Sequence, residues 1–186
     1  EKTKFIIPGN TLRELIKILK DENNQITVVT SPRHVLFDCG NYKVFTRLIE
    51  GDFLKYAPII AAPNTIFVEI ENRVITNSLE RALLIINEDD SGRDIKIPVK
   101  FNIDADRMEV SSLTGKGKVY DVVPANVKGN KLTVGFNCKF MLDALRVCDG
   151  EMINMEFSTP NGGCFIKSVH DTGSETFLIL PVKLNN

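Results

Sequence analysis

The chain has 186 residues, of which 43% are hydrophobic and 25% charged, the balance of a soluble globular protein. Its formal net charge is −1, so any contact with nucleic acid must come from cations gathered on one surface. Four cysteines without a C-x-x-C spacing and only two histidines argue against a zinc site. We therefore expect no metal and no cofactor. No apolar run approaches the ~20 residues that span a bilayer, so we also expect no membrane contact.

Three stretches of the chain repeat the order strand, helix, strand, strand, strand. In each repeat the second range is the helix. The first repeat covers 5–8, 11–21, 26–31, 34–39 and 42–49, and the second covers 65–70, 78–88, 97–104, 107–113 and 118–124. The third covers 132–137, 138–148, 152–158, 163–169 and 176–184. One unit cannot cover both its helix and its sheet, whereas two units side by side can. The sequence therefore predicts an α+β fold of repeated β-α-β-β-β units, with two helices on one face of a continuous antiparallel sheet.

The repeats also predict the domain organisation. The second and third repeats form one complete domain at 63–186, and the first is the second half of another domain at 1–62. The proline-punctuated segment 51–64 connects the two. Since the chain begins almost at a strand, we expect it to be a fragment of a longer protein.

Each predicted helix carries cations away from its apolar stripe. They are Arg13, Lys17, Lys20, Arg81, Lys139 and Arg146. Equivalent helices in equivalent units would show these cations on a common surface. The alternative is an ordinary solvated helix face, with local ion pairs such as one between Glu14 and a nearby lysine. The pattern alone leaves both interpretations open.

No catalytic motif stands out. His34 lies in a turn and His170 next to one, with no nucleophile at a recognisable spacing. The Asp-Thr-Gly at 171–173 fits a tight turn between strands better than an aspartic protease, and the Gly-Lys-Gly-Lys at 115–118 lacks the P-loop order. The acidic residues at 88–90 fit solvent-exposed positions at the end of a helix. The sequence therefore predicts a protein that is not an enzyme.

Four blocks carry a resemblance to a known family. They are TRLIEGDFLKY (46–56), SLERALLIINE (78–88), VGFNCKFMLDALR (134–146) and FLILPVKL (177–184). The four blocks occur in this order on the predicted repeats. With them, the chain resembles a C-terminal fragment of the bacterial DNA sliding clamp, the beta subunit of DNA polymerase III. Each block is weakly specific alone, whereas the four together cover essentially the whole chain.

The resemblance implies a head-to-tail homodimeric ring whose helices line a channel around duplex DNA. The implied function is processivity in chromosomal replication, without catalysis, in the cytoplasm at the nucleoid. Implied partners are double-stranded DNA bound without sequence preference, the replicative polymerase, the clamp loader and other proteins with a clamp-binding motif. The six helix cations named above become candidates for the DNA channel, since phosphate contacts carry no sequence information.

The resemblance further implies a pocket for partner peptides of the type Gln-Leu-x-Leu-Phe. Its positions here are Leu54, Pro58, Ile59, Asn137, Phe140, Gly162, Cys164, Leu178, Ile179, Leu180, Pro181, Val182, Lys183 and Leu184. Leu54 and Pro58 depart from the family pattern, Phe140 replaces a tyrosine, and Lys183 replaces an arginine whose fork it cannot reproduce. A divergent clamp-like protein with other partners, or an enzyme on the same scaffold, are the alternative hypotheses.

Overall fold

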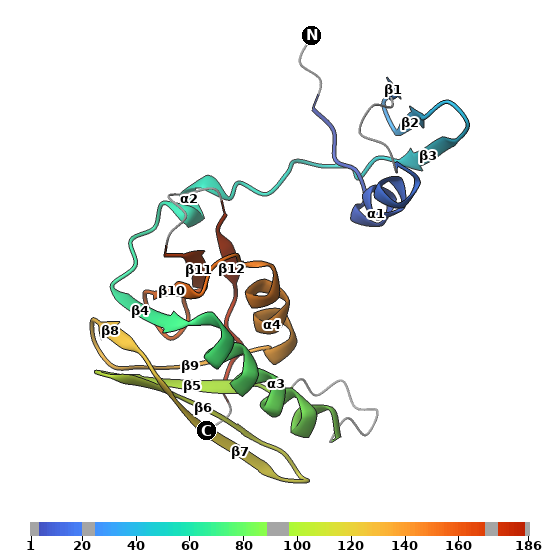
Figure 1. Cartoon of the computed structure of the whole chain (residues 1–186). Helices are drawn as coiled ribbons and strands as arrows, with labels where there is room; N and C mark the ends of the chain where they lie inside the picture. The colour runs from blue at the N-terminus through green and yellow to red at the C-terminus, as the bar shows by residue number, and fades with distance from the viewer. Residues whose placement is uncertain (1–3, 20–24, 89–96, 170–174, 185–186) are drawn as a thin grey trace. The chain divides into compact units, whose positions relative to one another are not determined.

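The computed structural model describes residues 4–19, 25–88, 97–169 and 175–184, and the chain forms two compact units. Unit 1 covers residues 1–61 and unit 2 covers residues 62–186 (Figure 1). The boundary expected from the repeats falls one residue later, after residue 62. None of the helices in the described ranges is both long and apolar enough to cross a membrane.

In its described residues, 4–19 and 25–61, unit 1 contains one longer helix, a three-stranded antiparallel sheet in the order β1-β2-β3, and one short helix (Figure 1). These elements are α1 (Gly9–Ile18), β1 (Thr27–Thr30), β2 (His34–Asp38), β3 (Lys43–Arg47) and α2 (Ala57–Ile60). The strand predicted at 5–8 is reduced to a single bridge between Ile6 and Ile49. The four-residue helix α2 was not predicted, because one turn has no periodicity to detect.

The core of unit 1 is small. Leu15 of α1 packs against Val35 and Phe37 of β2. Leu12 and Ile16, which helical spacing predicts on the same apolar stripe as Leu15, are 44% and 73% exposed. Only the middle of the predicted stripe is therefore buried within the described part of unit 1.

Unit 2 holds the remaining elements. They are β4 (Ile66–Glu71), α3 (Asn72–Glu88), β5 (Val99–Asp104), β6 (Arg107–Leu113), β7 (Lys118–Pro124), β8 (Asn126–Lys128), β9 (Leu132–Phe136), α4 (Cys138–Val147), β10 (Met152–Phe157), β11 (Cys164–Ser168) and β12 (Phe177–Ile179). The bounds of β6 and β7 are those predicted. Helix α3 begins at Asn72, not at Ser78, and the short strand β8 was not predicted.

The strands of unit 2 form two sheets, β12-β11-β10-β4-β8 and β7-β6-β5-β9, so the prediction of one continuous sheet was wrong. Strand β9 is also bridged to the segment after β12, where the Val182 N–H donates to the Gly135 carbonyl at 2.8 Å. Pro181, next to this bridge, has no N–H with which to extend the ladder. The α+β class itself is confirmed.

The two repeats of unit 2 exchange their first strands. Strand β4 opens the earlier repeat but pairs with β10 of the later one, in the register Ile70↔Ile153. Strand β9 opens the later repeat but pairs with β5 of the earlier one, in the register Phe101↔Val134. Each sheet is therefore completed by a strand from the other repeat.

Helices α3 and α4 lie side by side and share one core with both sheets (Figure 1). Phe136 links the sheets, with ring centroids 5.5 Å from Phe101 and 6.3 Å from Phe157. At the far end of α4, the side-chain N–H groups of Asn72 donate to the carbonyls of Leu145 and Cys148, each at 3.2 Å. This contact satisfies carbonyls that a helix end otherwise leaves free.

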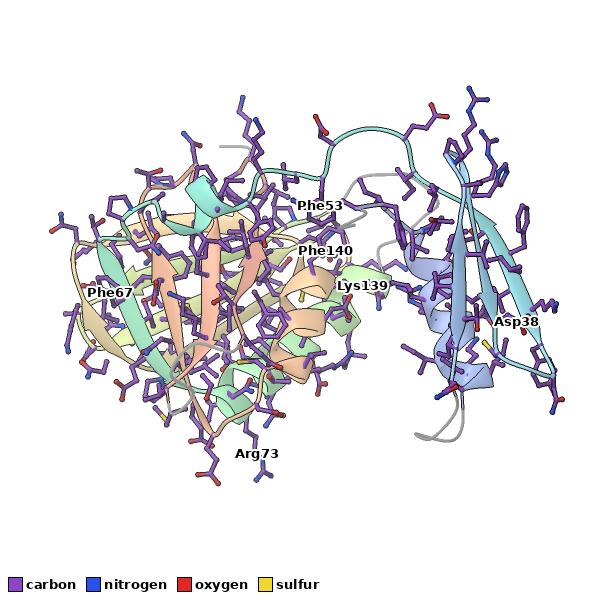
Figure 2. All side chains as sticks on the ribbon, turned by 90° about the horizontal axis from the view of Figure 1, so that it is seen from above. Asp38, Phe53, Phe67, Arg73, Lys139 and Phe140 are labelled. Atoms are coloured by element: carbon purple, nitrogen blue, oxygen red, sulfur yellow. The ribbon has the colours of Figure 1, made fainter. Side chains whose placement is uncertain are left out.

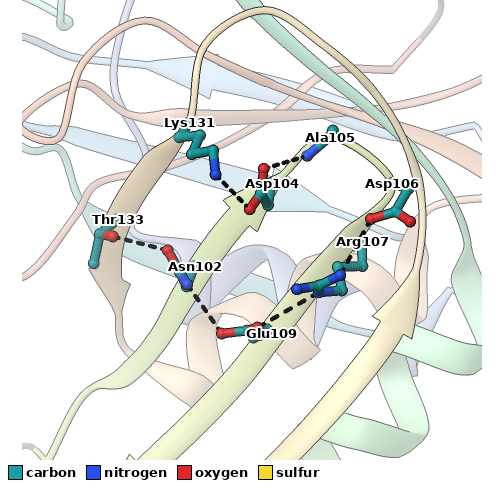
Figure 3. Close-up of polar contacts among 8 residues, drawn as sticks. All are labelled: Asn102, Asp104, Ala105, Asp106, Arg107, Glu109, Lys131 and Thr133. Carbon is teal, nitrogen blue, oxygen red and sulfur yellow. Dashed lines mark hydrogen bonds and ion pairs between the residues drawn. The ribbon is translucent and has the colours of Figure 1, made fainter.

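The other face of the β9-β5-β6 strands is polar (Figure 3). The Thr133 hydroxyl donates to Asn102 at 3.1 Å, and Asn102 donates to Glu109 at 2.9 Å. Beside them, the Lys131 ammonium donates to Asp104 at 2.8 Å. These pairs occupy the alternate positions of strands whose other side chains are buried.

Candidate functional site: an apolar groove beside helix α4

A groove of about 760 Å³ lies in unit 2, between the first turns of α4 and the segment that contains β12. Its lining residues are Asn137, Phe140, Asp143, Ala144, Thr176, Phe177, Leu178, Ile179, Leu180, Pro181 and Val182. Pockets of about 300–1,000 Å³ with apolar walls and a few polar groups are typical of ligand sites. The groove has the size and lining of such a site.

One wall of the groove is set by the start of α4. Asn137 precedes the helix, and its Oδ1 accepts from the backbone N–H groups of Lys139 at 3.0 Å and Phe140 at 3.3 Å. This is an N-cap, which fixes the first turn of a helix. Met141 and Leu142 anchor the opposite face in the core, so Phe140 stays 55% exposed at the groove. Figure 2 shows Lys139 and Phe140 at this end of α4.

The other wall is an edge strand and the residues that follow it. Among the described strands, β12 pairs only with β11, in the register Cys164↔Ile179. The side chain of Ile179, the last residue of β12, is buried, whereas the next residue, Leu180, is 69% exposed. Beyond it, Leu184 packs over Gly135, where a Cβ would lie 2.6 Å from Leu184 Cδ2. The missing side chain of Gly135 thus lets this segment lie against β9.

The structure brings together half of the residues predicted for the pocket. Those that line the groove are Asn137, Phe140, Leu178, Ile179, Leu180, Pro181 and Val182. Gly162 lies in the turn between β10 and β11, and Lys183 and Leu184 continue past the groove. Cys164 is fully buried, and this burial raises the pKa of its thiol well above the usual value. Leu54, Pro58 and Ile59 are exposed residues of unit 1.

Four lining residues were missed: Asp143, Ala144, Thr176 and Phe177. Asp143 and Ala144 lie three and four positions after Phe140, so helical spacing places all three on one face. That spacing would have found them. Thr176 and Phe177 carry no comparable signal before β12.

Three of the six predicted channel cations are ion-paired. Lys17 pairs with Glu14 at 2.7 Å, Arg146 of α4 with Glu80 of α3 at 2.9 Å, and Arg81 of α3 with Asp121 of β7. Burial acts to raise the pKa of Asp121, but the hydrogen bond and charge of Arg81 outweigh it, and the pKa is lowered. The pairs fit the alternative of an ordinary solvated helix face.

The remaining three cations differ. Arg13 donates to the side chain of Asn10 at 3.3 Å. Lys139 makes no side-chain hydrogen bond or ion pair with the residues that the structure describes. Lys20 lies outside the described ranges. Among the described residues, Arg13 and Lys139 are thus the predicted channel cations without an acidic partner.

The histidines and acids of the described ranges are dispersed. No group of three or more His, Cys, Asp or Glu side chains there is placed to hold a metal ion. His34 stacks on Phe45 with ring centroids 4.9 Å apart. His170 and the Asp-Thr-Gly at 171–173 lie outside the residues described.

Comparisons with known proteins decide the family. Residues 59–183 match the DNA polymerase III beta subunit, C-terminal domain, and residues 1–55 match its central domain. The chain belongs to the DNA polymerase III beta subunit family. The beta sliding clamp of Staphylococcus aureus is 32% identical over 185 residues, which cover 98% of this chain and 48% of that protein. The chain thus spans about half the length of the curated relatives it matches.

Solved structures of the family share the fold. A putative DNA polymerase III beta subunit from Eubacterium rectale has a TM-score of 0.82 and 32% identity, over 98% of this chain and 48% of that one. The sliding clamp of Bacillus subtilis has a TM-score of 0.81 and 29% identity, over 100% and 48%. The resemblance inferred from the four sequence blocks is therefore confirmed.

Proposed function

We propose that the chain is part of a bacterial sliding clamp, the processivity factor of chromosomal replication. The whole protein would encircle duplex DNA as a ring of two subunits in the cytoplasm, at the nucleoid. It would hold the replicative polymerase, the clamp loader and other proteins through the groove beside α4, without catalysis of its own. One observation carries this proposal. In a chain of this family, Asn137 and Phe140 line the same groove as the segment 178–182.

The groove suits a short peptide with apolar anchors. Burial of one Leu or Phe side chain contributes about 1.5–3 kcal/mol, and ordering of the peptide offsets part of this gain. Two anchors and a few hydrogen bonds give about −5 to −6 kcal/mol, a dissociation constant in the high micromolar range. Partners of this strength can bind and exchange quickly.

Contact with DNA would come from the helices. Phosphate contacts hold a duplex without selecting a sequence, which is what a sliding protein needs. Arg13 and Lys139 would be the leading contacts, because neither side chain is paired with an acid among the described residues. Arg81 and Arg146 would act more weakly, since each must first separate from Asp121 or Glu80.

The test is a fluorescence titration of the 186-residue chain with a labelled Gln-Leu-x-Leu-Phe peptide. The control peptide has alanine in place of both leucines and the phenylalanine. We expect saturable binding of the first peptide only. Phe140→Ala and removal of residues 181–186 should each abolish it.

The matched control is Phe67→Ala, since Phe67 is also a partly exposed aromatic residue of unit 2. It lies on β4, away from Phe140 (Figure 2), and its loss should leave the affinity unchanged. Equal binding of the peptide and its alanine control would refute docking at the groove. So would an equal loss of affinity from Phe67→Ala and Phe140→Ala.

A further inference from the structure

Among the residues that the structure describes, the groove is lined by one charged side chain, that of Asp143. The other described lining residues are apolar or neutral. Asp143 lies on α4 one turn after Phe140, so its carboxylate sits beside the most exposed apolar group of that wall. A ligand whose apolar side chains cover Phe140 must therefore come close to this charge.

The carboxylate of Asp143 has no partner among the described residues. This sets it apart from Glu80 and Asp121, the acids near the same helices, which pair with Arg146 and Arg81. Lys139 lies one turn before Asp143, but the two side chains form no ion pair. A lysine four residues before an acid is also the less favourable order of such a pair on a helix.

An unpaired carboxylate at the rim of an apolar groove imposes a condition on the ligand. Covering the groove removes water from the neighbourhood of Asp143, which disfavours the charge unless the ligand supplies a donor. A Lys or Arg side chain of the ligand would supply one, whereas an Asp or Glu at the same place would repel.

We infer that Asp143 is a specificity-determining residue, which selects partner peptides that carry a Lys or Arg beside their apolar anchors. The inference rests on the proposed function of the groove as a peptide site. Asp143 is exposed, so the pair it forms is of the exposed kind, worth a factor of about two to five in affinity. The preference should shrink as salt approaches about 0.15 M and above, because exposed charges are screened.

The experiment compares two series of labelled peptides that share the Leu and Phe anchors. At each non-anchor or flanking position in turn, one series carries Lys and the other carries Glu. With the natural chain, at least one position should show a two- to fivefold preference for Lys. Asp143→Asn should remove that preference, and Asp143→Lys should reverse it.

Asp149→Asn is the matched control, because Asp149 is an exposed acid at the other end of α4 and does not line the groove. It should leave the Lys preference intact. A ratio of Lys to Glu affinity that is unchanged by Asp143→Asn at every position would overturn the inference. If the anchors still matter in the same titrations, the groove remains a peptide site. If peptides without anchors bind equally well, both proposals fall together.

Discussion

The N-cap of α4 gives the sharpest prediction, because one side-chain atom fixes one wall of the groove. Asn137→Ala removes the oxygen that accepts from the N–H groups of Lys139 and Phe140. Loss of such a cap lowers the free energy of unfolding by about 1 kcal/mol, within a range of about 0.5–2. With a urea m-value of about 2 kcal/mol per molar, the midpoint should fall by about 0.5 M.

Far-UV circular dichroism is the suitable signal, since the chain contains no tryptophan. Asn137→Asp and Asn137→Ser serve as controls because both keep an oxygen that can cap the helix. We expect each control to lose less than half of what Asn137→Ala loses. If Asn137→Ser is as unstable as Asn137→Ala, the capping bonds do not account for the effect. The reasoning would also be refuted if Asn137→Ala and the natural chain had the same urea midpoint of unfolding.

Three further predictions concern charge and thiols. The hydrogen bond from Lys131 holds the pKa of Asp104 below its usual 3.8, so its stabilising contribution is complete above that pH and is lost as the pH falls through the folded value. The difference in Tm between the natural chain and Asp104→Asn should therefore narrow in acid, and a gap that stays constant with pH would contradict this. Burial raises the pKa of Cys138 to about 12, whereas Cys39 is only half-buried, so a thiol reagent at neutral pH should label Cys39 first, as peptide mapping would show. When the affinity for duplex DNA is measured over a range of salt concentrations, Lys139→Gln should reduce the slope of log affinity against log salt concentration by about 0.9. Replacement of an ion-paired helix cation by glutamine should reduce this slope by less.

Much of the fold follows from local patterns. Strands β6 and β7 were predicted with their observed bounds because the turn residues at 104–106 and 114–117 delimit the two runs. In the structure, buried and more exposed side chains alternate strictly in β6, whereas Val123 is the one buried residue of β7. The start of α3 was missed because Val74, Ile75 and Thr76 are β-branched and favour strands. Burial of Ile75 and the contacts of Asn72 with α4 override this preference, and both come from residues distant in the sequence.

The candidate site was predictable where it follows a motif. Asn137 and Phe140 belong to one of the four blocks, and the groove contains them. Asp143 belongs to the same block but was passed over, since a charge on a helix usually faces solvent. The pairing of Arg81 with Asp121 joins α3 to β7 and cannot be read from helical spacing, because it spans two elements.

The exchange of first strands between the repeats of unit 2 has a practical consequence. A cut in the turn at Gly129 and Asn130, between β8 and β9, would take one strand from the sheet of the earlier piece and two from the sheet of the later piece. The earlier piece would need β9 from the later one, and the later piece would need β4, with β8 paired beside it, from the earlier one. Two such pieces could restore their sheets only by association, which makes this turn a natural position at which to divide the domain into complementing halves.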